Sequence, residues 1–344
     1  MYSPKEQAMN KRFDLKFWLG IGISIFFLVL LFRKIDFQQL VNTLGSADYR
    51  YIIVAVAFTF ISYFLRAVRW HYLLIPVKNI SIASLYPATI IGYMANNLLP
   101  ARLGEFVRAF VLARKEGLQA PVVFASLVID RLCDGFTVML MLLLTLFTLH
   151  LPQGMAEAGT TLKSGGMITF VLYAGLVIFL ILLKWQTVRT MRLVAYVLKP
   201  LPCGLSDRLI PLLGSFIGGI GIPSRGVHVT AVLLSSLLIW TFALLPIDFI
   251  LQAFGIHLPI SASMFIMVLL VFAVLVPASP GYIGTYHYAC FKGLSAFQIP
   301  EDVSISIALV IHGTSFFPVI VAGFYHLWRG KMSLRSVQKA GDAI

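Results

Sequence analysis

Apolar runs separated by short polar or basic stretches dominate the sequence and predict membrane-spanning helices. An α-helix needs about 20 consecutive, mostly apolar residues to cross the hydrocarbon core of a bilayer. About six full spans are expected, at residues 17–32, 51–65, 136–151, 167–183, 229–251 and 303–328. Residues 37–47 predict a short interfacial helix. The basic and aromatic residues at 66–72 predict an interfacial belt at the end of the second span.

Two further apolar stretches contain breaks that a simple spanning helix would not carry. The stretch at residues 82–99 contains Pro87 and is followed at once by Pro100, and the stretch at 261–297 is interrupted by Pro and Gly. If the first stretch crossed fully, the basic residues after it would lie outside, against the tendency of Lys and Arg to stay in the cytoplasm. We therefore predict a re-entrant hairpin at 84–114 from the cytoplasmic side and an opposed hairpin in the second stretch from the outside.

The fold class expected from this pattern is all-α: a polytopic transmembrane helical bundle of about six full spans plus two opposed re-entrant hairpins. A plain eight-span bundle is the alternative. The composition agrees, because 59% of the 344 residues are hydrophobic and 12% are charged, whereas about 25% of a soluble domain is charged. A single membrane-embedded domain is predicted at residues 17–328, between cytoplasmic tails at 1–16 and 329–344.

The net charge of +13, from 27 Lys and Arg residues against 14 Asp and Glu residues, would suggest nucleic acid in a soluble protein. Among apolar spans, positive residues instead hold the cytoplasmic side of the membrane. The expected location is the cell (inner) membrane, with both termini in the cytoplasm and no nucleic-acid partner. The three cysteines lie far apart without a CxxC pair, which argues against a disulfide framework or a zinc site.

The two breaks share a pattern. Residues 100–104 and 280–284 each read P-x-x-x-G directly after an apolar segment, in opposite predicted topology. Irregular backbone at membrane depth must be buried in protein or line a wet cavity, because lipid cannot satisfy its polar groups. Paired breaks in the two halves of a chain are typical of a transporter site near the bilayer midplane. The sequence therefore predicts an inverted pseudo-repeat with a site between the hairpins, unless the two breaks arose by chance.

The first break carries the densest polar cluster, which we expect to line the cavity and contact a lipid head group. Its residues are Asn96, Asn97, Pro100, Arg102, Gly104, Glu105 and Arg108. On a helix that starts near residue 101, Arg102, Glu105 and Arg108 would share roughly one face. Arg binds phosphate in a bidentate way, and the free N–H groups of a helix N-terminus add to an anion site. The alternative is an interfacial helix whose Arg side chains only reach out to the head-group region.

A second cluster, Asp130, Arg131 and Asp134, lies within an apolar helix. Charges inside a span are costly and usually face a cavity or a partner. The two carboxylates are four residues apart and share a face, so they are expected to pair with Arg102 or Arg108. A purely structural salt bridge and a proton-carrying carboxylate remain alternatives.

The third cluster belongs to the second break and comprises Pro277, Pro280, Gly281, Gly284 and His287. Glycines let the backbone come close to a ligand. His287 is a candidate proton acceptor or head-group contact, although a lone histidine near a membrane interface is more often structural. His312, in the last span, is expected to be a hydrogen-bonded residue of the bundle.

No catalytic residue, metal site or cofactor is predicted. The sequence has no Gly-rich phosphate loop, no HExxH, no GxSxG and no Cys/His zinc spacing. Transport would therefore be passive or ion-coupled. A membrane-embedded enzyme remains an alternative, because Glu105, Asp130, Asp134 and His287 could form an acid/base set.

Three motifs carry a resemblance: NLLPARLGEFVR at 97–108, VIDRLCDG at 128–135 and PASPGYIG at 277–284. In this order they resemble the lysylphosphatidylglycerol synthase transmembrane-region family, a flippase-like family that includes the flippase half of multiple peptide resistance factors. The resemblance covers about residues 17–328. Many relatives have a Glu after the last Gly, where this chain has Thr285. The family's soluble aminoacyltransferase domain is also missing, so lysyl transfer from tRNA is not expected.

The resemblance implies lipid handling, because family members are thought to move aminoacylated phospholipids or are linked to hopanoid, polyprenyl-sugar and envelope glycolipid pathways. The leading hypothesis is a translocase that moves the head group of a phospholipid or polyprenyl-linked lipid between leaflets through a polar midplane cavity. The expected partners are membrane lipids with an anionic or phosphate-bearing head group. The alternatives are a membrane enzyme of envelope lipid synthesis and an accessory subunit or scaffold for such enzymes.

Overall fold

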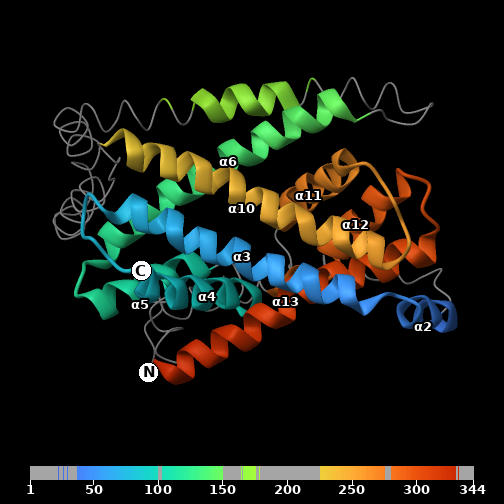
Figure 1. Ribbon diagram of the computed structural model, residues 1–344, viewed down its shortest axis with the longest axis horizontal. Helices are drawn as coiled ribbons and strands as arrows, with labels where there is room; N and C mark the ends of the chain where they lie inside the picture. Colours follow the sequence, from blue (N-terminus) through green and yellow to red (C-terminus); the bar gives the residue numbers. More distant parts are fainter. Residues whose placement is uncertain are drawn as a thin grey trace, which may run out of the picture.

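The computed structural model describes residues 37–99, 103–149, 166–175, 225–275, 280–330 and a few single positions (Figure 1). Its regular elements, within these ranges, are all helices. Nearly all of the first predicted span, most of the second half of the fourth, the N-terminal tail and most of the C-terminal tail lie outside the described residues. Three described helices are long and apolar enough to cross a membrane. The prediction of an all-α membrane protein is confirmed.

The described helices fall into one short N-terminal helix and two larger groups. They are α2 (Phe37–Gly45), then α3 (Tyr49–Leu74), α4 (Ile82–Leu98), α5 (Gly104–Glu116) and α6 (Ala120–Thr148), then α10 (Gly226–Ala253), α11 (Ile260–Leu275), η2 (Pro280–Tyr282), α12 (Thr285–Ser295) and α13 (Glu301–Arg329). A short apolar helix, Gly166–Gly175, lies between the groups in sequence. The three helices that meet the spanning criteria are α3, α10 and α13.

The two groups have the same architecture: a long helix, two short helices and a second long helix. The lengths are 26, 17, 13 and 29 residues for α3 to α6 and 28, 16, 11 and 29 residues for α10 to α13. The packing is reciprocal as well, because α4 lies on α13 and α11 lies on α6. In Figure 1, α3 and α10 lie side by side and run in opposite directions. This arrangement is an inverted repeat, the architecture of many transporters.

The short helices are too short to cross a membrane. At 1.5 Å per residue, α4 and α5 are about 25 Å and about 20 Å long, against about 30 Å for the hydrocarbon core. The pair α11 and α12 is shorter still. These lengths favour two re-entrant hairpins over the eight-span alternative.

The two breaks meet, as their paired pattern predicts. The C-terminal end of α4 packs against η2. A Cβ atom on Gly281 would lie 3.7 Å from the backbone oxygen of Asn97. The ends of the two hairpins are therefore neighbours within one site.

Three predicted helix boundaries are wrong. The second predicted span continues past residue 65 to Leu74, and Arg66 and Arg69 are buried within it rather than in an interfacial belt. The helix with the predicted span at 136–151 begins at Ala120. The helix after the first break begins at Gly104 rather than near residue 101. The first two helices continue through charged residues because these are paired: Arg66 and Arg69 bind Asp130 and Asp134. The third helix starts at Gly104, whose N–H is bound by Asn96.

Each hairpin has its own apolar core. Leu85, Ile91 and Leu112 belong to a buried cluster around α4 and α5. Ile266, Leu294 and Ile307 belong to a second cluster around α11, α12 and α13. The polar residues of the candidate site lie between these two cores.

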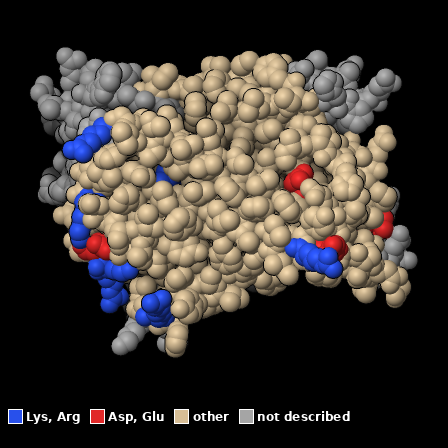
Figure 2. Space-filling view, in the orientation of Figure 1, with Lys and Arg blue, Asp and Glu red and all other residues tan. Residues whose placement is uncertain are grey.

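Charged side chains gather near the two ends of the long helices. Figure 2 shows most Lys, Arg, Asp and Glu atoms near the left and right edges, with a broad and largely uncharged region between them. At the outer end of the first hairpin, Lys78 Nζ donates to Glu116 Oε2 at 3.0 Å. This hydrogen bond holds the pKa of Glu116 below its ordinary value. The Lys78–Glu116 pair therefore stabilises the protein at a pH above the ordinary pKa of Glu. This stabilisation is lost as the pH falls through the lowered pKa of Glu116.

Gly104 allows the two helices of the first hairpin to touch. A Cβ atom on Gly104 would collide with the backbone oxygen of Gly92 and the side chain of Asn96. We expect Gly104→Ala to lower the free energy of unfolding by about 1–3 kcal/mol, the usual cost of overpacking. An SDS titration of the purified protein measures this change. Gly226→Ala is the matched control, because a Cβ atom on Gly226 would meet nothing within 4 Å. Equal stability of the two variants would contradict this close contact.

Candidate functional site

Two carboxylates and two guanidinium groups form the centre of a buried ion network between α3 and α6. Asp130 and Asp134 lie one turn apart on α6, and Arg66 and Arg69 lie one turn apart on α3. Arg69 donates from Nε to Asp130 Oδ1 at 2.8 Å and from Nη2 to Asp134 Oδ1 at 2.7 Å. Arg66 Nη1 lies 2.9 Å from Asp134 Oδ2. The side chains of Arg69 and Asp130 are 0% exposed, so each charge depends on its partners.

Two more arginines approach the same carboxylates. Arg108 Nη1, on α5, lies 3.0 Å from Asp130 Oδ2. Arg131 Nη2 lies 3.0 Å from Asp130 Oδ2 and 3.1 Å from Asp134 Oδ2, and Arg131 Nη1 lies 3.9 Å from Glu105 Oε1. One of the two predicted pairings, that of Asp130 with Arg108, is therefore present. The other predicted partner, Arg102, lies outside the described residues.

The network carries more positive than negative charge. Its four Arg residues give +4 and its three carboxylates give −3, a sum of +1 within the described part of the chain. Four buried nitrogens find no acceptor among the described residues: Arg66 Nε, Arg108 Nε, Arg108 Nη2 and Arg131 Nε. Surplus positive charge and unused N–H donors are suited to an anion.

Aromatic rings surround the guanidinium groups. The Cζ atom of Arg108 lies 3.9 Å from the ring centroid of Trp70. Arg66 Cζ lies 5.3 Å from the Trp240 ring and 5.4 Å from the Tyr93 ring. Cation–π attraction is stronger where the charge is removed from water. These rings therefore stabilise positive charge where carboxylates are too few.

Polar contacts with α10 join the network to the second repeat. Arg69 Nη1 donates to Ser236 Oγ at 3.1 Å, and Trp240 Nε1 donates to Asp134 Oδ1 at 3.1 Å. One turn before the network, Ser62 Oγ donates to the backbone oxygen of Ile239 at 3.0 Å. The network therefore fixes α10 as well as α3, α5 and α6.

Asn96 bridges the first break. Its Oδ1 accepts the Gly104 N–H at 2.7 Å, and its Nδ2 donates to Glu105 Oε1 at 3.3 Å. The first N–H groups of a helix lack a partner within that helix, so Asn96 satisfies one of them for α5. Glu105 is held between Asn96 and Arg131.

Two histidines hold the second break. His312 Nε2 lies 2.8 Å from the backbone oxygen of Gly281. The Gly284 N–H donates to His287 Nδ1 at 3.3 Å. Gly281 and Gly284 have φ angles of 77° and 94°, a region that favours glycine. The two imidazole rings themselves are in contact, with centroids 4.7 Å apart.

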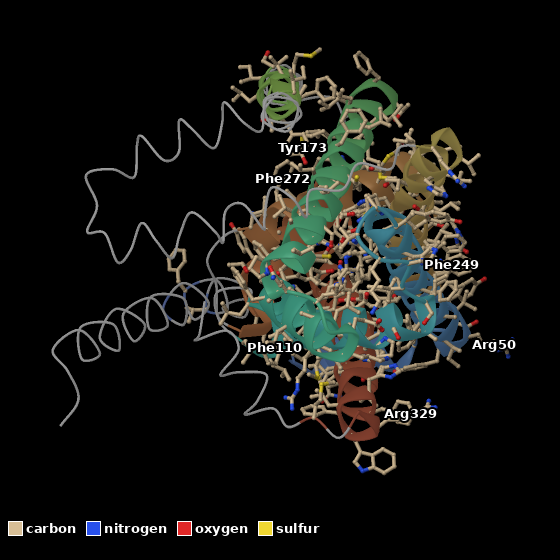
Figure 3. The ribbon with its side chains drawn as sticks, turned by 90° about the vertical axis from the view of Figure 1, so that its left-hand side faces the viewer. Arg50, Phe110, Tyr173, Phe249, Phe272 and Arg329 are labelled. Carbon is tan, nitrogen blue, oxygen red and sulfur yellow. The ribbon has the colours of Figure 1, made fainter. Side chains whose placement is uncertain are left out.

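A cavity of about 810 Å³ lies between the two repeats. One part of its wall is charged and polar and contains Arg66, Asn97, Glu105, Arg131 and Asp134. The rest is largely aromatic and aliphatic and includes Tyr173, Trp240, Met267, Leu270, Phe272 and Phe316. Figure 3 labels Tyr173 and Phe272, which lie close to α6 at the top of that view. The cavity therefore joins a polar end to an apolar end, the property expected of a lipid site.

The structure brings most of the predicted site residues together. Asn97, Glu105, Arg131 and Asp134 line the cavity, and a further set lies directly behind this wall or at the breaks. That set is Asn96, Gly104, Arg108, Asp130, Gly281, Gly284 and His287. Pro280 belongs to η2, and Pro100, Arg102 and Pro277 lie outside the described residues. A role of these residues in binding stays a prediction.

Several site residues were missed in the sequence analysis. Arg66, Arg69, Tyr93 and Trp240 belong to the network, and His312 lines the cavity. Arg66 and Arg69 lie three residues apart and share a helix face, but the sequence does not show which distant carboxylates they would meet. No group of three or more His, Cys, Asp or Glu side chains among the described residues is arranged to hold a metal ion.

The fold and the site define an all-α membrane protein with an inverted repeat, two helical hairpins and a polar cavity between them. The sequence matches the family described as lysylphosphatidylglycerol synthase TM region over residues 17–323. The chain therefore belongs to this family.

Its relatives include UPF0104 membrane proteins and a protein named a glycosyltransferase. It is 25% identical to the glycosyltransferase AglD of Haloferax volcanii, over 88% of this chain and 53% of AglD. This chain thus spans about half the length of that relative. It is 21% identical to the UPF0104 membrane protein PH1989 of Pyrococcus horikoshii, over 94% of this chain and 100% of the relative. A UPF0104 membrane protein of Methanothermobacter thermautotrophicus is 22% identical, over 90% and 92% of the two chains. No solved structure matches.

Arg69 and Arg131 differ in burial, and we expect their loss to have different consequences. Arg69→Met should lower the free energy of unfolding by about 3–5 kcal/mol, because it leaves buried carboxylates without their central partner. Arg131 is 34% exposed, so Arg131→Met should cost about 1 kcal/mol or less. SDS titrations of both variants measure the difference. Equal losses would contradict the central place of Arg69.

Proposed function

We propose that this protein moves the phosphate-bearing head group of a membrane lipid between leaflets through the cavity between its two hairpins. The observation that carries the proposal is the cavity itself, because a charged wall, backed by an ion network with one surplus positive charge, continues into an apolar wall. Phospholipids and polyprenyl-linked lipids share this combination of an anionic head group and apolar tails. The proposed binding partner of the site is therefore a membrane lipid.

The charged wall suits a phosphate. Arg66 and Arg131 both line the cavity, and the buried Nε–H of each, behind the cavity surface, has no acceptor among the described residues. Arg131 can be reached from the cavity because its side chain is 34% exposed. Arginine binds phosphate oxygens through charge-assisted hydrogen bonds. A phosphate here would offset the surplus charge of the network.

The apolar part of the cavity leads outward. Leu275 lines the cavity and is 60% exposed on the surface of the described bundle. Acyl or prenyl tails can therefore stay in the bilayer while the head group occupies the polar end. This division removes the main barrier to lipid transfer, the desolvation of the charged head group.

The inverted repeat supplies a way to alternate access. Each hairpin ends at the site, and the two hairpins belong to repeats that run in opposite directions. Rocking or gating of one repeat against the other is the usual way in which inverted repeats expose a fixed site to both faces. We place the protein in the cell membrane with cytoplasmic termini, as its Lys and Arg distribution favours. Envelope-biosynthesis enzymes are its expected protein partners.

Head-group flipping in proteoliposomes tests the proposal. We expect wild-type protein to transfer a fluorescent phospholipid between leaflets, measured by its accessibility to dithionite. Arg131→Met should slow the transfer by about tenfold or more, because a charge-assisted hydrogen bond contributes about 1.5–3 kcal/mol. Arg102 lies outside the described residues and is predicted to contact the head group. Arg102→Ala should therefore slow the transfer as well.

Arg50→Met is the matched control. Arg50 also lies on a long helix, α3, but it is exposed at the outer edge of the molecule (Figure 3). Removing its charge should leave the transfer rate unchanged. Transfer no faster than in protein-free vesicles would refute the proposal, and equal slowing by Arg50→Met would refute the site.

A second candidate function is supported by one comparison. The relative AglD is named a glycosyltransferase, so this chain is alternatively an enzyme or an accessory subunit acting on a lipid-linked sugar or phosphate. Purified protein would then transfer the sugar of a sugar nucleotide to a polyprenyl phosphate, which forms a glycolipid and releases the nucleotide. We expect no product above the level of the Asp130→Asn variant. Product formation that requires Asp130 would favour the enzyme over the translocase.

A further inference from the structure

The second break is fastened at both ends by histidine. His312, on α13, contacts the Gly281 carbonyl, and His287, on α12, contacts the Gly284 amide. Between these glycines lies Tyr282, whose φ of 57° is unusual for a residue with a side chain. Tyr282 lines the cavity. The two histidines therefore hold a strained segment of the cavity wall.

The chemistry of the two contacts fixes where the imidazole protons are. A carbonyl oxygen only accepts, so His312 Nε2 must carry a proton and donate to Gly281. A backbone N–H only donates, so His287 Nδ1 must be bare and accept from Gly284. The observed hydrogen bonds therefore require a bare Nδ1 on His287.

A proton and the Gly284 amide compete for the same atom. Protonation of His287 at Nδ1 replaces the lone pair that accepts the Gly284 N–H. His287 is also the third residue of α12, and positive charge near a helix N-terminus is unfavourable. Proton uptake thus releases Gly284 and weakens the start of α12.

The surroundings of the pair contain few other titratable groups. Besides His287, the titratable residues of α12 are Tyr286, Tyr288, Cys290 and Lys292. Tyr282 of η2 and Tyr63 of α3 lie on the cavity wall. The sequence of α11 contains no titratable residue. The acids and the arginine of α13, Glu301, Asp302 and Arg329, lie at its two ends, and Asp248 of α10 is bound by Gln252 and Ser263. No carboxylate among the described residues contacts either ring to hold a proton there.

We propose that His287 and His312 form a proton-operated latch on the second break. His312 anchors Gly281, and His287 holds Gly284 while its Nδ1 is bare and releases it when that nitrogen takes up a proton. Release frees the Gly281–Gly284 segment and with it Tyr282 in the wall of the lipid site. Proton uptake by the latch then controls head-group movement. This consequence rests on the proposed function, whereas the latch itself does not.

Amide hydrogen exchange of Gly284 reads the latch without any lipid transfer. We expect its protection factor, corrected for the intrinsic exchange rate, to fall as the pH drops below about 6.5, the ordinary pKa of histidine, because the released imidazole binds a proton more readily than the held one. With one linked proton, the fall approaches about tenfold per pH unit at most. His287→Gln should abolish this pH dependence, because a glutamine oxygen can accept the Gly284 N–H but does not titrate. His257→Gln, at an exposed histidine between α10 and α11, should leave it intact.

Two results would overturn the latch: a protection factor that does not vary with pH in the wild type, or a pH dependence that survives in His287→Gln. If His287→Gln does not fold, ¹⁵N spectra of wild-type histidines decide, because they report whether protonation of an imidazole accompanies the loss of protection. Lipid flipping is measured separately. An inactive protein with a working latch would refute the proposed function alone, and an active protein without pH-dependent exchange would refute the latch alone.

Discussion

The cost of placing charge away from water governs the centre of this protein. Arg69 and Asp130 have no exposed side-chain surface, and neither would be tolerated alone at membrane depth. Their pairing requires α3 and α6 to lie next to each other with Arg69 facing the two aspartates. Contacts to Ser236 and Trp240 extend the same requirement to α10. The position of the cavity follows, because its polar wall is the accessible side of this network.

The two repeats share a backbone arrangement but differ in chemistry. The segments LVID at 127–130 and LVIH at 309–312 occupy similar places in α6 and α13. Asp130 holds the ion network in the first repeat, whereas His312 holds the second break in the other. One half of the site therefore has permanent charge, whereas the other has histidines that can take up a proton. In the proposed function the first wall binds an anion, and in the proposed latch the second responds to protons.

Much of this architecture could be predicted from the sequence. Proline and glycine breaks within apolar stretches predicted the two hairpins, because such breaks cannot face lipid. Asp130 and Asp134 were predicted as site residues because charge inside an apolar helix is costly and usually faces a cavity or a partner, and Glu105 because it belongs to the polar cluster at the first break. Arg66 and Arg69 were missed because they follow an apolar run, where an interfacial position is the usual expectation. Their burial depends on carboxylates more than 60 residues away in sequence, a pairing that no local pattern reveals. The contact of His312 with Gly281 was also beyond the sequence, because it joins residues 31 positions apart through a backbone carbonyl, and a backbone acceptor has no side-chain signature.

A cryo-EM map of the protein in lipid nanodiscs tests most directly whether the cavity holds a lipid head group. We predict density for a phosphate at hydrogen-bonding distance from the guanidinium groups of Arg66 and Arg131, with tails that leave past Leu275 into the bilayer. A cavity filled by side chains, with lipid phosphates only at the two membrane surfaces, would contradict the proposal.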